Sequence, residues 1–183
     1  DLHSFPTRRS SDLTGGSLTA FANYRLYLYG KLLWDPYQDV EVLTDRFFEQ
    51  YYKECAPQMR ELFDMYMTHL QNVNIHEYHS KKDANMFPRN IVDRAEELVN
   101  EALAVCNAMD DTVVAQKIKN RCFDELYCIH LTKICFYSAY GYPLDEYKDF
   151  YNLFVSEMED ANMPRYSERV SMSEFLDSIK PKS

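Results

Sequence analysis

The feature that most constrains this chain is the return of an apolar residue every three or four positions along most of its length. The stretch after Pro57 shows it clearly, with Met59, Leu62, Phe63, Tyr66 and Leu70. This spacing places the side chains on one face of an α-helix. Glycine, which all-β proteins use in their many turns, occurs only 4 times in 183 residues. The sequence therefore predicts an all-α, irregular bundle of about six or seven helices.

Proline, glycine and capping residues set the expected ends of these helices. We expect helices over residues 18–33, 40–52, 57–70, 88–109, 112–140 and 143–158, and a short one after 171. Asp39 is suited to cap the second helix, and Ser171 with Glu174 forms a capping box for the last. Gly141 is a candidate left-handed cap for the fifth. Residues 72–87 lack periodicity and predict the longest loop.

The charge and hydropathy of the chain argue against two kinds of partner. The formal net charge is −9, which disfavours binding to nucleic-acid phosphates or to an anionic membrane surface. No run of eighteen apolar residues is present, so no transmembrane helix is expected. The compartment stays open, with secretion or the periplasm among the possibilities.

The first thirteen residues, DLHSFPTRRSSDL, are expected to be a non-native leader. One choice of codons for this stretch reproduces a widely used DNA sequencing adapter in a single reading frame. We therefore exclude residues 1–13 from reasoning about the fold, as for any processing scar. We expect the genuine sequence to begin near Thr14, with its upstream part missing.

Histidines and cysteines give no self-contained catalytic or metal motif. His76 and His79 have HxxH spacing in an expected loop, so a solvated loop is favoured over a metal site, which in zincins needs HExxH on a helix. His69 and His130 are expected on helix surfaces or as hydrogen-bonded core residues. The five cysteines lack CxxC spacing and predict buried free thiols, with neither a zinc site nor a disulfide framework; they are Cys55, Cys106, Cys122, Cys128 and Cys135.

Carboxylates are plentiful, but a solvated helix face is the favoured interpretation for them. Paired carboxylates can hydrolyse glycosides only when they face each other across a sugar-binding cleft. The residues considered are Glu96, Glu97, Glu101, Asp124, Glu125, Asp145, Glu146, Glu157 and Glu159. The sequence predicts no catalytic, substrate-binding or metal-ligating residue and no cofactor.

The first expected helix carries more apolar residues than one buried face requires. Twelve of the seventeen residues from 18 to 34 are apolar or aromatic; they are Leu18, Ala20, Phe21, Ala22, Tyr24, Leu26, Tyr27, Leu28, Tyr29, Leu32, Leu33 and Trp34. Such a helix needs partners on two sides, so we expect one apolar face to be exposed. Nearby, Trp34, Tyr37, Tyr51 and Tyr52 predict an aromatic cluster, for which core packing is favoured over stacking on sugars.

One segment resembles a known protein family. YRLYLYGKLLWDPYQDVEVLTDRFFEQYY, residues 24–52, is similar to bacterial proteins of the domain of unknown function 4838, which read roughly LRAYLLAKLLWDP and then DVDALIDEFLEGYYG. The match includes the LLWDP run of residues 32–36. Lys53 departs from the family, which usually has glycine there, and this leaves the local turn geometry open. The later helices resemble the family more loosely.

The resemblance implies a role within a larger enzyme. Family members resemble glycoside hydrolases that have an α-glucuronidase-like domain followed by a (β/α)₈ barrel. Residues 14–36 would then be the last barrel helix, and residues 37–183 a C-terminal helical bundle. The chain would be a catalytically incomplete support region of a carbohydrate-active enzyme, with the upstream barrel as its partner and carbohydrate reached only through the parent protein. The alternatives are a self-contained helical protein-interaction module and, with no ligand set evident on facing helices, a metal-dependent helical enzyme.

Overall fold

The structure, a computed structural model, describes residues 19–73, 84–167 and 170–181, and within these residues it confirms the all-α prediction. It contains seven α-helices and two short 3₁₀-helices across the described ranges. The only β-type pairing among the same residues is an isolated antiparallel bridge between Arg165 and Ser171. The expected leader, residues 1–13, and the His76–His79 segment lie outside the described residues.

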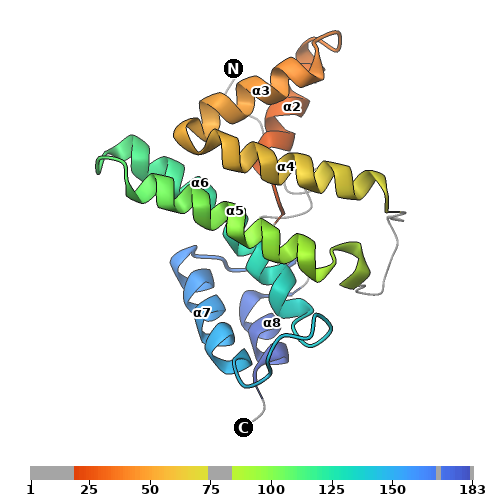
Figure 1. Cartoon of the computed structure of the whole chain (residues 1–183), viewed down its shortest axis with the longest axis vertical. Coiled ribbons are helices and arrows are strands. Elements are labelled where there is room, and N and C mark those ends of the chain that lie inside the picture. Colours follow the sequence, from red (N-terminus) through yellow and green to blue (C-terminus); the bar gives the residue numbers. More distant parts are fainter. Residues whose placement is uncertain (1–18, 74–83, 168–169, 182–183) are drawn as a thin grey trace.

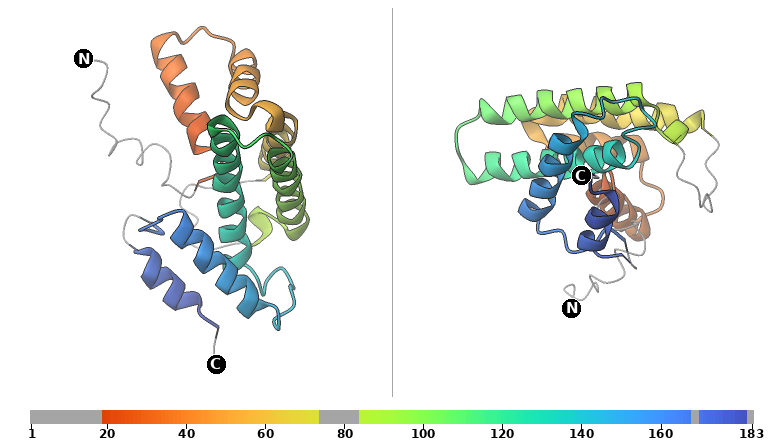
Figure 2. Two further views of the ribbon diagram at one scale, coloured as in Figure 1. Left: turned by 90° about the vertical axis from the view of Figure 1, so that its left-hand side faces the viewer. Right: turned by 90° about the horizontal axis from the view of Figure 1, so that it is seen from below.

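The helices form three groups along the long axis of the molecule (Figure 1). A hairpin of α2 and α3 lies at one end, α4, α5 and α6 cross the middle, and α7 and α8 lie at the other end, as the left view of Figure 2 also shows. Their bounds are α2 Ala22–Trp34, α3 Val40–Tyr51, η1 Lys53–Cys55, α4 Ala56–Gln71, η2 Ala84–Met86, α5 Arg89–Asn107, α6 Val113–Cys135, α7 Tyr147–Asp160 and α8 Met172–Ile179.

The predicted helix starts are confirmed at two capped positions. The Asp39 carboxylate accepts hydrogen bonds from the backbone N–H groups of Glu41 and Val42 at the start of α3. Ser171 and Glu174 make the reciprocal bonds of a capping box at the start of α8. Each cap satisfies N–H groups that have no partner within the helix, which is why these side chains mark the boundary so well.

The boundary between the fifth and sixth expected helices was predicted wrongly. Helix α6 ends at Cys135, not near residue 140, and α7 begins at Tyr147, not at 143. The intervening segment instead turns back over α5, where the Tyr140 hydroxyl donates to the Phe87 carbonyl and the Tyr142 hydroxyl donates to Asp93. Burial of these two tyrosines outweighs local helix propensity. Gly141 does adopt the left-handed conformation, with φ 71°, but within this turn.

Two apolar cores hold the helices together. The larger core lies where α2 to α6 meet, and its fully buried members include Phe48, Leu62, Leu98 and Ile118. A smaller core forms where α7 and α8 pack on the end of α6, around Phe154. Within the described part of the chain, no helix combines the length and the apolar character that crossing a bilayer requires.

The turn between α3 and α4 contains a strained residue. Lys53 has φ 49°, in the left-handed region, and its side chain is exposed. This conformation costs a residue with a Cβ about 1–2 kcal/mol, whereas glycine adopts it freely. The family that residues 24–52 resemble usually has glycine at this position, and the left-handed backbone geometry explains that preference.

Replacing Lys53 with glycine should therefore stabilise the protein. We expect Lys53→Gly to raise the free energy of unfolding by up to about 1 kcal/mol, since relief of strain outweighs the added chain entropy of the unfolded state. Arg46→Gly, at an exposed position inside α3, is the matched control and should lower stability by roughly 0.5–1 kcal/mol. Urea unfolding measures both, and a loss of stability in Lys53→Gly would contradict the strain argument.

Candidate functional site

Helix α2 has two apolar faces on opposite sides of its axis. Phe21, at its N-cap, and Tyr24 are buried against the bundle, whereas Leu26, Tyr29 and Leu33 are 38%, 45% and 81% exposed. At 100° per residue, positions 26, 29 and 33 lie about 140–200° around the helix from position 24. The second face therefore points away from the core that the first face helps to form.

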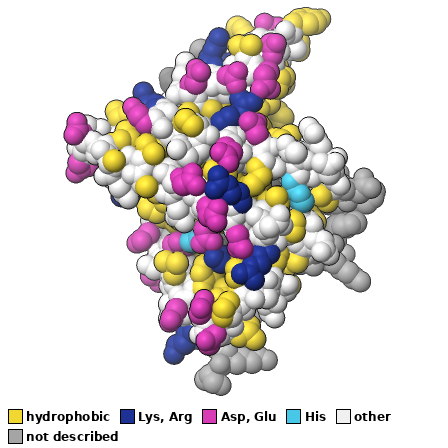
Figure 3. All heavy atoms as spheres, viewed as in Figure 1, with side chains coloured by type: hydrophobic (Ala, Val, Ile, Leu, Met, Phe, Trp, Pro, Cys, Tyr) yellow, Lys and Arg dark blue, Asp and Glu magenta, His cyan; other side chains and the backbone are white. Residues whose placement is uncertain are grey.

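The exposed face continues to the tip of the α2–α3 hairpin. Trp34 and Tyr37 are 89% and 95% exposed there. Figure 3 shows hydrophobic side chains gathered at this end of the molecule. We call the five side chains the apolar ridge: Leu26, Tyr29, Leu33, Trp34 and Tyr37. The exposed apolar face predicted for this helix is thus confirmed, although Leu18 lies outside the described residues.

The predicted aromatic cluster around the hairpin is wrong as a single unit. Tyr52 is buried and Tyr51 is half-buried in the main core, where the Tyr51 ring stacks on Phe47 at 4.7 Å between centroids. Trp34 and Tyr37 instead extend from the hairpin tip. The cause is the length of the hairpin, because α2 and α3 continue beyond the helices on which their other ends pack.

The inner face of α2 is held by aromatic packing and one buried hydrogen bond. The Tyr24 ring packs edge-on against Phe63 and Phe47, with centroids 4.9 and 5.4 Å away. Its hydroxyl lies 2.8 Å from the Thr44 hydroxyl of α3, which in turn donates to the Val40 carbonyl. This side of the helix is satisfied within the chain, so any further partner must contact the other side.

A buried carboxylate fixes the start of α2 to the bundle. The side chain of Glu125, on α6, accepts hydrogen bonds from the Phe21 backbone N–H at 3.1 and 3.0 Å. It also accepts one from the Tyr52 hydroxyl at 3.2 Å. A negative group at a helix N-terminus is favourable because the first N–H groups lack partners in the helix. The predicted solvated position of Glu125 is wrong, because the side chain is buried.

Burial governs the ionisation of Glu125. Removal from water raises its pKa, and the bonds from Phe21 and Tyr52 offset only part of that effect, so that the pKa is about 7. The neighbouring carboxylate of Asp124 adds to the rise. Glu125 therefore titrates near neutral pH at the joint between α2 and α6.

A second buried polar cluster joins α7 to the middle of the bundle. His130, on α6, lies 2.8 Å from the Glu157 carboxylate through Nδ1 and 3.2 Å from Glu96 through Nε2. Lys133 donates to Glu96 at 2.6 Å. Burial lowers the pKa of His130, but the two carboxylates outweigh it and raise the pKa above its ordinary value. Burial likewise raises the pKa of Glu96, whereas His130 and Lys133 bring it down to about 2.

The role of this cluster is structural. Both carboxylates are occupied by His130 or Lys133, and His130 is buried, as predicted for a hydrogen-bonded core residue. Two carboxylates that flank an imidazole cannot at the same time flank a glycosidic bond. His69 is similarly satisfied, since its Nε2 lies 2.6 Å from the Met86 carbonyl.

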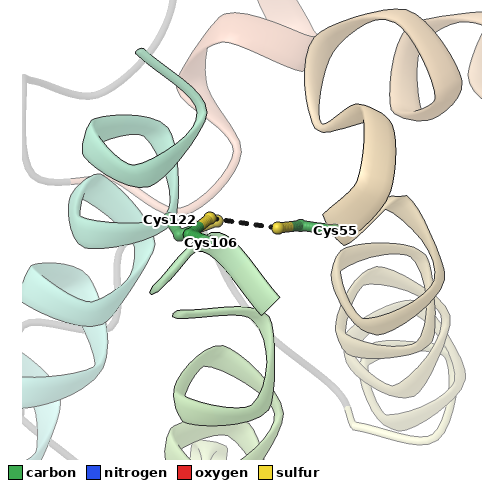
Figure 4. A group of neighbouring side chains, drawn as sticks. All are labelled: Cys55, Cys106 and Cys122. Atoms are coloured by element: carbon green, nitrogen blue, oxygen red, sulfur yellow. Dashed lines mark hydrogen bonds between the residues drawn. The ribbon is translucent and has the colours of Figure 1, made fainter. Parts of the chain in front are cut away.

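Three of the five cysteines meet in the main core. Cys55 of η1, Cys106 of α5 and Cys122 of α6 are buried, and their sulfur atoms all lie within 4.8 Å of one another. The Cys55 and Cys106 sulfurs are 3.1 Å apart. Figure 4 shows the side chains of Cys106 and Cys122 directed at Cys55 across the gap between helices. All five cysteines are free thiols, as predicted, but Cys128 and Cys135 are only half-buried.

Sequence reasoning missed that these three thiols lie together. They belong to three different elements, and no local motif marks them because their separation in sequence exceeds any helical repeat. Burial raises the thiol pKa of both Cys55 and Cys122, and in each case the nearby Cys106 adds to the effect. The one partial signal was the register of Cys106 and Cys122, each of which falls on the apolar stripe of its helix.

A shallow pocket beside α8 lacks a catalytic set. Its volume is about 310 Å³, and one carboxylate, Glu159, is the only acidic group that lines it. The other lining residues are Met158, Asn162, Met163, Pro164, Met172 and Leu176. This surface offers no base, nucleophile or cation to accompany the carboxylate.

Fold and surface together define a helical bundle in which helix α2 presents an apolar face outward. Residues 10–64 match the family model described as "Domain of unknown function (DUF4838)", which confirms the resemblance for this segment. The match includes α2, α3, η1 and the first half of α4, and so contains the entire apolar ridge. No curated protein and no solved structure matches the chain.

The ionisation of Glu125 predicts a specific pH dependence of stability. Because its folded pKa, about 7, exceeds its ordinary value of 4.5, the folded state binds the proton more tightly, and stability falls as pH rises between these values. The loss attributable to this group should reach roughly 3 kcal/mol above pH 7. Glu125→Gln cannot ionise and should remove that part of the decline.

Urea unfolding at a pH near 5 and a pH near 8 tests this expectation. Glu49→Gln, at an exposed position of α3, serves as the matched control and should keep the wild-type decline. The contribution of His130 is common to all three proteins and cancels in the comparison. An equal decline in wild type and Glu125→Gln would mean that the carboxylate is not the titrating group.

Proposed function

We propose that this chain is the C-terminal helical support region of a glycoside hydrolase-like, carbohydrate-active protein and is catalytically incomplete on its own. In this proposal the apolar ridge docks on an upstream (β/α)₈ barrel of the same protein. The observation that carries the proposal is the second apolar face of α2, which lies within the segment that matches the family model.

The energetics of the ridge support a buried role. Each large apolar side chain left in water forgoes roughly 1.5–3 kcal/mol relative to burial. Several adjacent ones make a patch of the kind that marks an interaction site on soluble proteins. The inner face of α2 is already satisfied by Tyr24, Thr44 and Phe63, so the ridge needs a separate partner.

A barrel is the partner that best suits a helix with two apolar faces. The outer helices of a (β/α)₈ barrel cover the strands with one face, and a domain that follows the barrel can pack on the other. A barrel helix begins near the catalytic face and ends at the opposite one. Trp34, at the end of α2, would then lie far from the sugar, which favours a docking role for it over a stacking role.

The docking proposal predicts that one ridge substitution weakens association with the upstream region. We would recover the reading frame upstream of Thr14 from the same DNA, express it separately, and measure its binding to the present chain. Leu33→Glu should weaken that binding by at least about tenfold, because a central apolar contact contributes more than about 1.4 kcal/mol. The free energy of unfolding of the Leu33→Glu chain should differ from that of the wild type by less than about 0.5 kcal/mol, because Leu33 is 81% exposed.

Leu144→Glu is the matched control, since Leu144 is 69% exposed but lies between α6 and α7, outside the ridge. It should bind the upstream region as the wild type does. An upstream frame without alternating strands and helices, or equal binding by Leu33→Glu and wild type, would overturn the proposal. The ridge would then favour a self-contained protein-interaction module.

The same proposal predicts that the purified chain hydrolyses no glycoside. Its most enclosed carboxylates, Glu96, Glu125 and Glu157, are bound to His130, Lys133, Tyr52 or the Phe21 backbone, so none is free to act as acid or nucleophile. Release of nitrophenol from aryl-glucuronides and aryl-hexosaminides should equal the rate without protein. Turnover that persists through further purification steps would show that the chain carries its own active site.

A further inference from the structure

We propose that Cys55, Cys106 and Cys122 form a three-thiolate site for a single soft metal ion, Cu(I). The three sulfurs come from η1, α5 and α6, and all lie within 4.8 Å of one another in the main core. This site is independent of the docking role of the apolar ridge and uses no residue of it.

The spacing of the sulfurs is close to that of a shared ion. Three sulfurs each about 2.3 Å from a common metal lie about 4 Å from one another when the arrangement is trigonal. The distance of 3.1 Å between Cys55 and Cys106 and the limit of 4.8 Å for the group bracket this value. Rotamer adjustments of less than 1 Å per sulfur would therefore admit the ion, without rearrangement of the helices.

The number and type of ligands select the ion. Thiolates favour soft ions, among which Cu(I) and Zn(II) are the common choices. Structural zinc takes four protein ligands, whereas no fourth cysteine, histidine or carboxylate joins this group among the residues that the structure describes. All three cysteines are at most 5% exposed, which leaves little access for water as a fourth ligand. A three-coordinate Cu(I) ion meets these conditions.

Burial disfavours ionisation of these thiols, and two helix ends beside the cluster offset part of that cost. Cys55 is the N-cap residue of α4, where the partial positive charge of the helix favours a thiolate. Cys106 lies in the last turn of α5, whose carbonyl end favours a cation. Each thiol that coordinates the ion releases its proton to solvent and forms one sulfur–copper bond, with no change in oxidation state.

The site also has a structural consequence. It would connect η1 to α5 and α6, and so would fix the segment that follows α3 onto the middle of the bundle. An ion that binds only the folded state raises the free energy of unfolding. At high ion concentration this increase is proportional to the logarithm of the ratio between the ion concentration and its dissociation constant. Cu(I) should therefore raise the thermal midpoint of the full chain.

The experiment uses the full chain, reduced and free of oxygen, with Cu(I) supplied as its bathocuproine disulfonate complex. We expect the protein to withdraw one Cu(I) per chain, with sulfur-to-copper charge-transfer absorption. X-ray absorption should report three sulfur neighbours on the copper. Wild type that takes up no copper, or copper with fewer than three sulfur neighbours, would overturn the proposal.

Variants separate this site from the remaining cysteines. Loss of a residue that only supports a metal ligand typically weakens metal binding by roughly 10–100-fold. Because Cys55 is proposed as a ligand itself, Cys55→Ser should weaken Cu(I) binding by more than this and should leave the copper with two sulfur neighbours. The matched control is Cys128→Ser with Cys135→Ser, which removes the two half-buried thiols and should bind as the wild type does. If Cys55→Ser does not fold, the sulfur count of the control decides the outcome. Loss of copper in the control would refute the assignment.

Discussion

The joint between Glu125 and the start of α2 is the interaction on which the remainder of the hairpin depends. The Glu125 carboxylate accepts hydrogen bonds from the Phe21 N–H and the Tyr52 hydroxyl in the interior, and so fixes the start of α2 and the end of α3, which lie at one end of the hairpin, to α6. A buried polar group of this kind is tolerated because its hydrogen bonds are made. Once this end is fixed, the opposite end must extend beyond the bundle, and the apolar ridge is the result.

The two buried polar groups differ in what they contribute. Glu125 accepts its hydrogen bonds from the Phe21 N–H and the Tyr52 hydroxyl and resists ionisation, whereas Glu96 and Glu157 share His130, and His130 with Lys133 brings the pKa of Glu96 down to about 2. The first joins the hairpin to α6, and the second joins α7 to α5 and α6. The middle helices therefore act as a common platform. The three cysteines meet in the main core, whereas the apolar ridge lies on the α2–α3 hairpin.

Sequence reasoning succeeded where the controlling interactions are local. The caps at Asp39 and Ser171 satisfy N–H groups only two or three residues away, so their helix starts could be read directly. The excess of apolar residues in α2 likewise follows from helix geometry, and its exposed face is confirmed. The predicted end of α6 and start of α7 are wrong because Tyr140 and Tyr142 are buried against residues some fifty positions earlier.

The sequence by itself determined the helical class, most helix starts and the two-sided character of α2, because each depends on residues within one or two turns. Only the tertiary structure decided that Glu125 is buried, that Trp34 and Tyr37 are exposed, and that three cysteines meet. Those outcomes depend on how α2, α5 and α6 cross, which is set by side-chain packing between segments distant in sequence. No local sequence pattern predicts how these helices cross. The contacts among the buried polar and cysteine side chains therefore follow only from the folded structure.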